Sequence, residues 1–182
     1  AQLDPATGRP RWTMRVNGEQ DIVGQTDGRL VVLNTTGTRR TLTLINATSH
    51  VLTTVRLSQT QPEGAPPTLL GTRLYFTSAS GSVRAVAPDT GRQLWESNST
   101  VESPGPPTAS ASHLYLASPS GRLAALNLRT GAVDATLQGR DDGGTADSTG
   151  LGAPLTLVGD ALYVPYGIRS VYTVDIRTLR AD

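Results

Sequence analysis

Three aspartates near the end of the chain come closest, by residue type and spacing, to a metal site. Asp141, Asp142 and Asp147 lie among glycines and threonines in the segment GRDDGGTADSTG. Carboxylate oxygens are ligands that Ca²⁺ favours, so such a loop could coordinate this ion. The spacing matches no EF-hand loop, however, and a solvated connection between two elements explains the same residues. We therefore expect no metal site, and these three residues are the candidates if one exists.

The two histidines are the candidates for acid–base or nucleophilic chemistry. A Ser–His–Asp arrangement can be written on paper for His113 and several serines, but no strained nucleophile elbow accompanies it. His50 stands at a position where comparable segments carry Gly, and few other residues tolerate positive φ there. Glycine-rich fingerprints for nucleotides are absent from the sequence. We expect no catalytic residue, and we lean against an enzyme without excluding one.

The elements that must position such residues are defined by an internal repeat. Three segments align without a gap, and each carries Pro, Thr and the dipeptide Leu-Tyr at matching positions. They read APPTLLGTRLYFTSASG from Ala65, GPPTASASHLYLASPSG from Gly105 and APLTLVGDALYVPYG from Ala153. Their tyrosines, Tyr75, Tyr115 and Tyr163, are separated by 40 and then 48 residues. Such agreement is hard to obtain by chance, so we infer a repeated structural unit.

A second motif, Asx-x-x-Thr-Gly-x-x-x-Trp, recurs between these segments. It is complete in DPATGRPRW (residues 4–12) and nearly complete in APDTGRQLW (residues 87–95). Degraded copies lie near residues 46–54, 127–135 and 175–179. We call these motifs the corners; at their glycine position stand Gly8, His50, Gly91, Gly131 and Leu179, which are 42, 41, 40 and 48 residues apart. The unit is therefore about 42 residues long.

Each unit is predicted to hold four short strands. In one copy these span residues 67–70, 73–77, 82–87 and 93–97, which are apolar or alternating and are bounded by Gly, Pro, Asp or Ser. Dipeptides typical of tight turns lie at Ser80-Gly81, Ser120-Gly121 and Asp27-Gly28. Four short antiparallel strands in a unit of about 40 residues are typical of a β-propeller blade. An immunoglobulin-type sandwich would show strands without a corner motif at a fixed period.

The expected fold is all-β, a single propeller domain over residues 1–182 with about four blades. The chain opens near the last strand of one blade (residues 11–16) and closes with three strands of another (residues 154–176). If the opening strand completed that last sheet, a closed four-bladed ring would result. Otherwise the chain is an arc of a larger propeller of seven or eight blades, and its open ends would favour self-association. The chain begins at Ala1 without a leader-like segment, so we expect a piece of a longer protein.

The corner sequences DPATGRPRW and APDTGRQLW resemble the PQQ-type (quinoprotein-like) propeller repeat, written A-x-D-x-x-x-G-x-x-x-W. The resemblance implies that Gly8, Gly91 and Gly131 make the turn before the last strand of a blade. It also implies that Trp12 and Trp95 dock between neighbouring blades, which makes these indoles structural. The residues agree with this, because Thr-Gly stands where the backbone needs positive φ.

The departures from the enzymes of that family concern the cofactor. Its dehydrogenases hold PQQ over a central calcium ion, with a vicinal Cys pair and a catalytic Asp. This chain has no Cys, and its family motifs place no Asp and Glu pair. We expect no cofactor; PQQ and calcium belong only to the alternative, a fragment of a PQQ-dependent quinoprotein dehydrogenase.

The charge and composition of the chain limit the kinds of partner that it is expected to bind. The net charge is +1, with 16 basic and 15 acidic residues interspersed, so the footprint of a nucleic-acid binder is missing. Tyr166 falls outside the register of the repeated tyrosines, and with Arg169 it is expected at a rim where a protein or small ligand docks. The resemblance implies an extracytoplasmic bacterial protein. We therefore expect a non-catalytic propeller that acts as a protein-binding scaffold or a ligand-sensing domain.

Overall fold

The computed structural model of the chain describes residues 2–13, 19–37, 39–57, 64–139, 152–166 and 170–181. All regular elements in these ranges are strands, which form one two-stranded and four four-stranded antiparallel sheets. No helix among the described residues has the length and apolar content required to span a membrane. The all-β prediction is confirmed.

Each four-stranded sheet is built from strands that follow one another in the sequence. The first sheet contains β3 (Glu19–Thr26), β4 (Arg29–Thr36), β5 (Arg39–Asn46) and β6 (Leu52–Arg56). The second contains β7 (Thr68–Leu70), β8 (Arg73–Thr77), β9 (Ser82–Val86) and β10 (Gln93–Asn98). The third contains β11 (Thr108–Ala109), β12 (His113–Ala117), β13 (Arg122–Asn127) and β14 (Val133–Gln138). The fourth contains β15 (Thr156–Val158), β16 (Ala161–Tyr166), β17 (Ser170–Asp175) and β18 (Arg180–Ala181).

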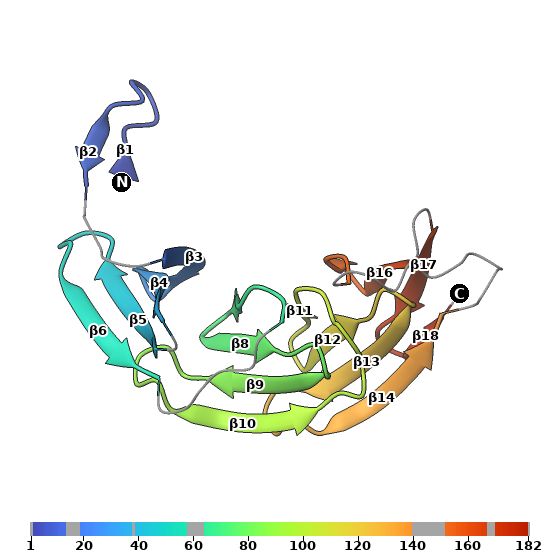
Figure 1. Cartoon of the computed structure of the whole chain (residues 1–182). Coiled ribbons are helices and arrows are strands. Elements are labelled where there is room, and N and C mark those ends of the chain that lie inside the picture. Colours follow the sequence, from blue (N-terminus) through green and yellow to red (C-terminus); the bar gives the residue numbers. More distant parts are fainter. Residues whose placement is uncertain are drawn as a thin grey trace.

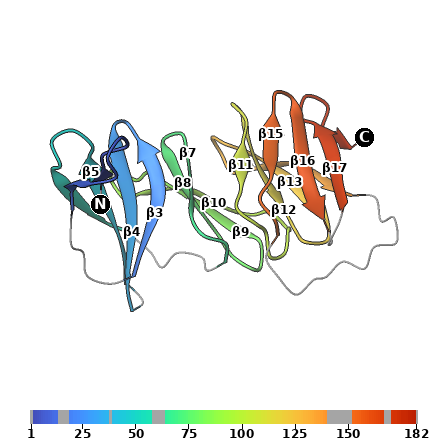
Figure 2. The ribbon, with the colours of Figure 1, turned by 90° about the horizontal axis from the view of Figure 1, so that it is seen from above.

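The four sheets follow a U-shaped arc. Their outer strands β6, β10 and β14 lie on the convex side, and β3 and β11 lie on the inner side (Figure 1). Seen from above, the sheets stand side by side in chain order (Figure 2). The structure thus has the predicted blades in the arrangement of an open arc.

The predicted alternative, a four-bladed ring closed by residues 11–16, is not adopted. Strand β2 (Pro10–Trp12) pairs with β1 (Gln2–Leu3) in a separate hairpin, and residues 14–18 lie outside the described ranges. The fourth strand of the last sheet is β18, which follows β17 in the sequence and pairs with it. The last unit therefore has one more strand than the sequence predicted.

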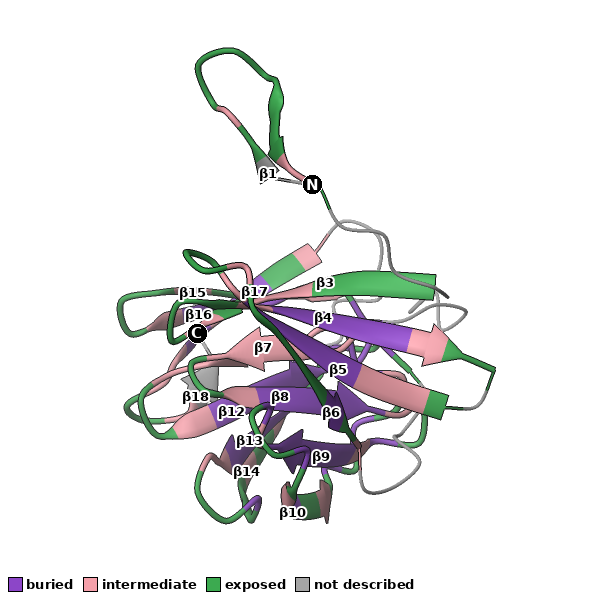
Figure 3. Cartoon of the chain, turned by 90° about the vertical axis from the view of Figure 1, so that its left-hand side faces the viewer, coloured by how far each residue is buried: buried purple, intermediate pink, exposed green. Residues whose placement is uncertain are grey.

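The core lies between the sheets. Strands β8, β9, β12 and β13 are buried almost along their whole length, on both faces. One apolar cluster joins each consecutive pair of sheets, and buried segments of β4, β5, β8 and β9 are seen together in Figure 3. Strands covered on both faces need near-continuous apolar sequences, which explains the runs in RLYFT and HLYLA.

The corners share one backbone conformation. The residues at the glycine position have φ of 67° at Gly8, 59° at His50, 69° at Gly91, 76° at Gly131 and 53° at Leu179. At every corner except that of Ala87, the motif opens with an Asx side chain that caps the turn; for example, the Asn127 side-chain oxygen accepts hydrogen bonds from the amides of Arg129 and Thr130. The spacing Asx-x-x-Thr-Gly therefore encodes an Asx turn that leads into a left-handed residue. His50 adopts the positive φ that its place in the repeat predicts.

Candidate functional site

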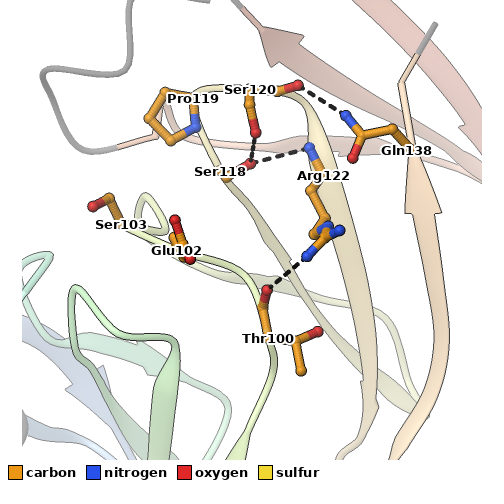
Figure 4. Close-up of a pocket in the computed structure, with 8 residues that line it drawn as sticks. All are labelled: Thr100, Glu102, Ser103, Ser118, Pro119, Ser120, Arg122 and Gln138. Carbon is orange, nitrogen blue, oxygen red and sulfur yellow. Dashed lines mark hydrogen bonds between the residues drawn. The ribbon is translucent and has the colours of Figure 1, made fainter.

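A cavity of about 340 Å³ opens at one end of the sheets, between the second and third. This end, here called the loop end, carries the turn 118–121 and the linker 99–107 that joins the two sheets. We call the hollow the linker cavity (Figure 4). Its lining residues are Thr100, Glu102, Ser103, Ser118, Pro119, Ser120, Arg122 and Gln138.

Hydrogen bonds fix the walls of the linker cavity. The Ser118 hydroxyl lies 2.8 Å from the Ser120 hydroxyl and accepts a bond of 3.0 Å from the Arg122 amide. The Gln138 amide group donates to the Ser120 carbonyl at 3.2 Å. The Arg122 guanidinium reaches across to the linker and donates to the Thr100 carbonyl at 3.3 Å. The turn and the linker are thus tied together across the opening.

The linker itself holds two strained residues. Thr100 has φ of 59° and Ser103 has φ of 46°, a region that a β-branched residue such as Thr rarely adopts. The surrounding bonds impose these angles: the Asn98 side chain accepts from the Thr100 amide at 2.9 Å, and the Ser103 amide donates to the Ala79 carbonyl at 2.7 Å. Strain that neighbours maintain is typical of sites held ready for binding. The linker cavity is therefore a pre-organised feature.

The chemistry of the linker cavity is suited to binding. Its lining offers one carboxylate on Glu102, one guanidinium on Arg122, one amide on Gln138 and several hydroxyls, but no His. These groups supply donors, acceptors and both signs of charge to a polar ligand. The sequence predicts only the turn at this site, whose Ser-x-Ser-Gly pattern (Ser118 to Gly121) also occurs in the preceding turn, Ser78 to Gly81.

Of the two residues predicted to contact a ligand at the rim, Tyr166 and Arg169, the structure describes only Tyr166. The ring of Tyr166 is half-buried and meets Tyr172 edge-on at 5.5 Å, and Tyr172 donates to the Gly121 carbonyl at 2.6 Å. Desolvation raises the pKa of the Tyr172 hydroxyl, with a smaller contribution from Tyr166. Tyr166 thus packs at the junction of the last two sheets, beside the turn that lines the linker cavity. Arg169 lies outside the described residues.

The three aspartates of the predicted metal loop also lie outside the described residues. In the part of the chain that the structure describes, His, Asp and Glu nowhere gather in groups of three or more suited to a metal ion.

The two indoles each meet the next corner along the chain. Trp95 is 7% exposed, and its indole N–H donates to the Leu128 carbonyl at 2.9 Å. A Cβ added to Gly131 would lie 2.5 Å from the Trp95 ring, so the ring covers the bare backbone of this corner. Trp12 is stacked on His50, with ring centres 4.8 Å apart and planes inclined by 11°. Both indoles therefore bridge consecutive repeats.

His113 does take part in a Ser–His–Asp hydrogen-bond chain. Its Nδ1 lies 2.9 Å from the Ser112 hydroxyl, and its Nε2 lies 3.0 Å from a carboxylate oxygen of Asp134. The same oxygen accepts a bond of 3.3 Å from Asn127. The chain spans β12, β13 and β14 at the end of the sheet opposite the linker cavity, and Ser112 sits directly before His113 in a turn rather than on a nucleophile elbow. We interpret it as a polar tie across three strands; the sequence did not single out Asp134.

The fold and its corners define a propeller of PQQ-like repeats. The family described as "Outer membrane protein assembly factor BamB" matches residues 1–180, and the chain belongs to this family. The resemblance inferred from the corner sequences is confirmed. Among curated proteins, none matches the chain.

Two solved structures resemble the chain in fold. BamB from Moraxella catarrhalis has a TM-score of 0.68 and 21% sequence identity, over 96% of this chain and 55% of that one. The computationally designed Ika8 protein has a TM-score of 0.62 and 15% identity, over 86% of this chain and 46% of that one. The chain thus spans about half the length of the structures it matches.

The sequence has no Cys, so the vicinal Cys pair that the resemblance associates with the PQQ–calcium site of the dehydrogenases is absent from this chain. The described residues bring no set of metal-binding side chains together.

Proposed function

We propose that this chain is part of a non-catalytic, extracytoplasmic β-propeller that serves as a protein-binding scaffold. Support comes from its family, which is described as an outer membrane protein assembly factor. The proposal places the partner at the loop end, over the linker cavity. Loops held on a rigid sheet framework are where proteins of this architecture bind their ligands.

The observation that carries the proposal is the construction of the linker cavity. Arg122 is anchored to the Thr100 carbonyl, Glu102 is exposed, and the backbone beneath them is held by bonds to both neighbouring sheets. Such a site offers a fixed pattern of charge and hydrogen-bond groups at little entropic cost, which favours recognition of a polar polypeptide. The lining combines hydroxyls with one carboxylate, on Glu102, and one guanidinium, on Arg122.

The test compares two arginines of the same sheet. A photo-crosslinking amino acid is introduced at Arg122, at the loop end, or at Arg129, which is exposed at the opposite end. In cells that produce the full-length protein, we expect a discrete cross-linked protein from position 122 and none from position 129. Arg122→Glu should abolish the cross-link formed from a probe at Glu102, whereas Arg129→Glu should leave it unchanged. Equal cross-linking from both ends, or none from either, contradicts the proposal.

The non-catalytic part of the proposal has its own test. Purified protein is mixed with PQQ and Ca²⁺, and its absorbance and melting temperature are recorded. We expect no bound-quinone spectrum and no stabilisation. Saturable uptake with a raised melting temperature would show that the chain is part of a quinoprotein, because a ligand that binds only the folded state stabilises it.

A further inference from the structure

A second cavity lies at the other end of the junction that holds the linker cavity. It has a volume of about 320 Å³ and opens between the second and third sheets, at the end that carries the corners. We call it the corner cavity. Among its lining residues are Leu70, Arg73, Tyr75, Ala109, Ser110 and Leu128. Each of the two sheets that form its walls has a further sheet beside it, so the corner cavity belongs to the interior of the arc.

Arg73 supplies the positive charge of the corner cavity, and its side chain is held in place. It is the first residue of β8 and is half-buried. Its guanidinium donates to the Leu128 carbonyl at 2.5 Å, and the Trp95 indole donates to the same carbonyl at 2.9 Å. The bond to Leu128 engages one N–H of the guanidinium, which carries several others. The cation is therefore fixed across the junction and can still donate to a ligand.

Arg73 differs from the other arginine that this sheet buries. Arg84 is 8% exposed, and its guanidinium lies 3.0 Å from a carboxylate oxygen of Glu96. In the described ranges no ion pair joins Arg73 to a carboxylate, although Asp27 and Asp89 line an adjoining cavity with it. Removing a cation from water costs free energy that an anion in contact with it offsets. The corner cavity therefore favours a ligand that carries a negative charge.

Two hydroxyl groups line the corner cavity together with the guanidinium. Tyr75 is 1% exposed, and burial raises the pKa of its hydroxyl, an effect that a hydrogen bond from Arg73 and the charge of Arg73 partly offset. The Tyr75 hydroxyl therefore stays protonated at neutral pH and can donate. The Ser110 hydroxyl, 3.3 Å from the Tyr115 hydroxyl, is the second such group. Neutral donors beside a single cation suit an anion of one negative charge.

The remaining walls of the corner cavity are aliphatic. They are formed by the side chains of Leu70, Ala109 and Leu128. A phosphate group would leave these walls without apolar contacts and would bring up to two negative charges to one guanidinium. A carboxylate attached to an apolar group uses both kinds of wall, as ligands of small-molecule sites usually do.

We propose that the corner cavity binds the carboxylate of a ligand with an aliphatic body, and that Arg73 is the counter-ion of this carboxylate. The carboxylate accepts from the guanidinium and the Tyr75 hydroxyl, and the aliphatic body contacts Leu70 and Leu128. A free organic acid and the last residue of a polypeptide both present this chemistry. The site lies at the end of the sheets opposite the loop end, so it is separate from the protein-binding site proposed above.

The experiment titrates the protein with 4-methylpentanoate and with the uncharged 4-methylpentanamide, followed by NMR. We expect saturable shifts of the Leu70 and Leu128 methyl signals with the acid and none with the amide. Arg73→Gln should raise the Kd of the acid by about tenfold or more, because it removes charge-assisted hydrogen bonds. Ala109→Leu keeps Arg73 but narrows the corner cavity, so it should weaken binding as well. Circular dichroism and melting temperature verify that the variants fold.

Arg29→Gln is the matched control. Arg29 is the first residue of β4, as Arg73 is of β8, and it lines the adjoining cavity. The control changes the net charge equally and should alter the Kd by less than about twofold, because solvent screens a charge that does not contact the ligand. Equal losses in the two arginine variants would place the acid in the adjoining cavity and overturn the proposal.

The source of the carboxylate is tested with acetyl-Gly-Leu that has a free carboxyl terminus. A lower Kd for this peptide than for 4-methylpentanoate supports a polypeptide terminus as the ligand, and a higher Kd supports a free acid; both results support the site. Inorganic phosphate that binds more tightly than either probe overturns the proposal, because the aliphatic walls would then contribute nothing. Equal binding of the acid and its amide, or no binding of either probe, overturns it as well.

Discussion

The junction between the second and third sheets and the junction between the third and fourth fill the same space in different ways. At the first, the Trp95 ring lies over the bare backbone of Gly131. At the second, Ala135 stands at the tryptophan position of the motif and Leu179 at the glycine position, and both pack against the cluster that joins these sheets. At the first junction the space is filled by a side chain of the last strand, Trp95. At the second junction it is filled by a side chain at the corner, Leu179.

This exchange indicates that, at these two junctions, the Trp position of one motif and the Gly position of the next share one space. Leu179 adopts φ of 53°, a region that costs a non-glycine residue about 1–3 kcal/mol. We infer that this conformational cost is tolerated because the small Ala135 leaves space for the Leu179 side chain. The corner of His50 is a third solution, since its ring adopts positive φ and stacks on Trp12. We infer that Leu179 compensates for the small Ala135 at the junction of the third and fourth sheets.

The largest effect is expected from Trp95→Ala. The substitution removes a buried ring and its hydrogen bond to Leu128 while Gly131 supplies nothing in exchange. We expect a loss of about 3–5 kcal/mol in the free energy of unfolding, measured by urea denaturation. Trp12→Ala is the control, because Trp12 is only half-buried and should cost less. Equal losses of unfolding free energy at the two positions would show that the deeper burial of Trp95 adds no stability.

Gly131→Leu should be the next most damaging change. Its Cβ would lie 2.5 Å from the Trp95 ring, and the backbone has φ of 76°. Backbone strain and overpacking together should cost about 2–4 kcal/mol in urea denaturation. A neutral substitution would mean that the ring can move aside, and the comparison of the two junctions would then lose its basis.

The double variant Trp95→Ala/Gly131→Leu rebuilds the pair found at the next junction. If the two positions share one space, the double variant should be more stable than the sum of the single losses predicts, by at least about 1 kcal/mol. The measurement is a double-mutant cycle under identical denaturation conditions. Strict additivity would show that Ala135 and Leu179 are unrelated changes.

The smallest effect concerns pH at the last corner. Hydrogen bonds from the Arg177 side chain, then from its backbone amide, lower the pKa of Asp175 from 3.8 to about 2. Because the folded-state pKa is depressed, this carboxylate stabilises the corner above pH 3.8, and the contribution is lost as the pH falls toward about 2. An NMR titration of the Asp175 carboxyl group should show a midpoint near 2, and Arg177→Ala should move it upward. A midpoint near 3.8 in the wild type would show that Arg177 does not lower the pKa of Asp175.

The repeat made much of the fold predictable. Residues 73–77 were predicted as a strand with the bounds of β8, and the corner positions carry positive φ even where Gly is replaced. The spacing of apolar residues indicates which side chains are buried. Because several copies of the repeat can be aligned, an exceptional residue in one copy does not obscure the pattern. The fourth strand β18 was missed because two residues carry no period.

The linker cavity was not predictable in the same way. Thr100 and Ser103 are poor choices for positive φ, and contacts with neighbouring sheets impose that conformation. Asp134 meets His113 only because β12 and β14 flank the same strand. Both features depend on residues that break the repeat or lie far apart in the chain, so an alignment of copies cannot reveal them.

Contacts between consecutive sheets have a consequence for cooperativity. Each apolar cluster joins one sheet only to its neighbours, as do the strand contacts of β3 with β7 and of β11 with β15. Such an array behaves as a linear chain of coupled units, in which an end unit has one stabilising neighbour and a central unit has two. The first and fourth sheets should therefore open before the second and third, with faster amide exchange in β4 and β17 than in β9 and β13. A partner that covers an end sheet would slow exchange along the whole array.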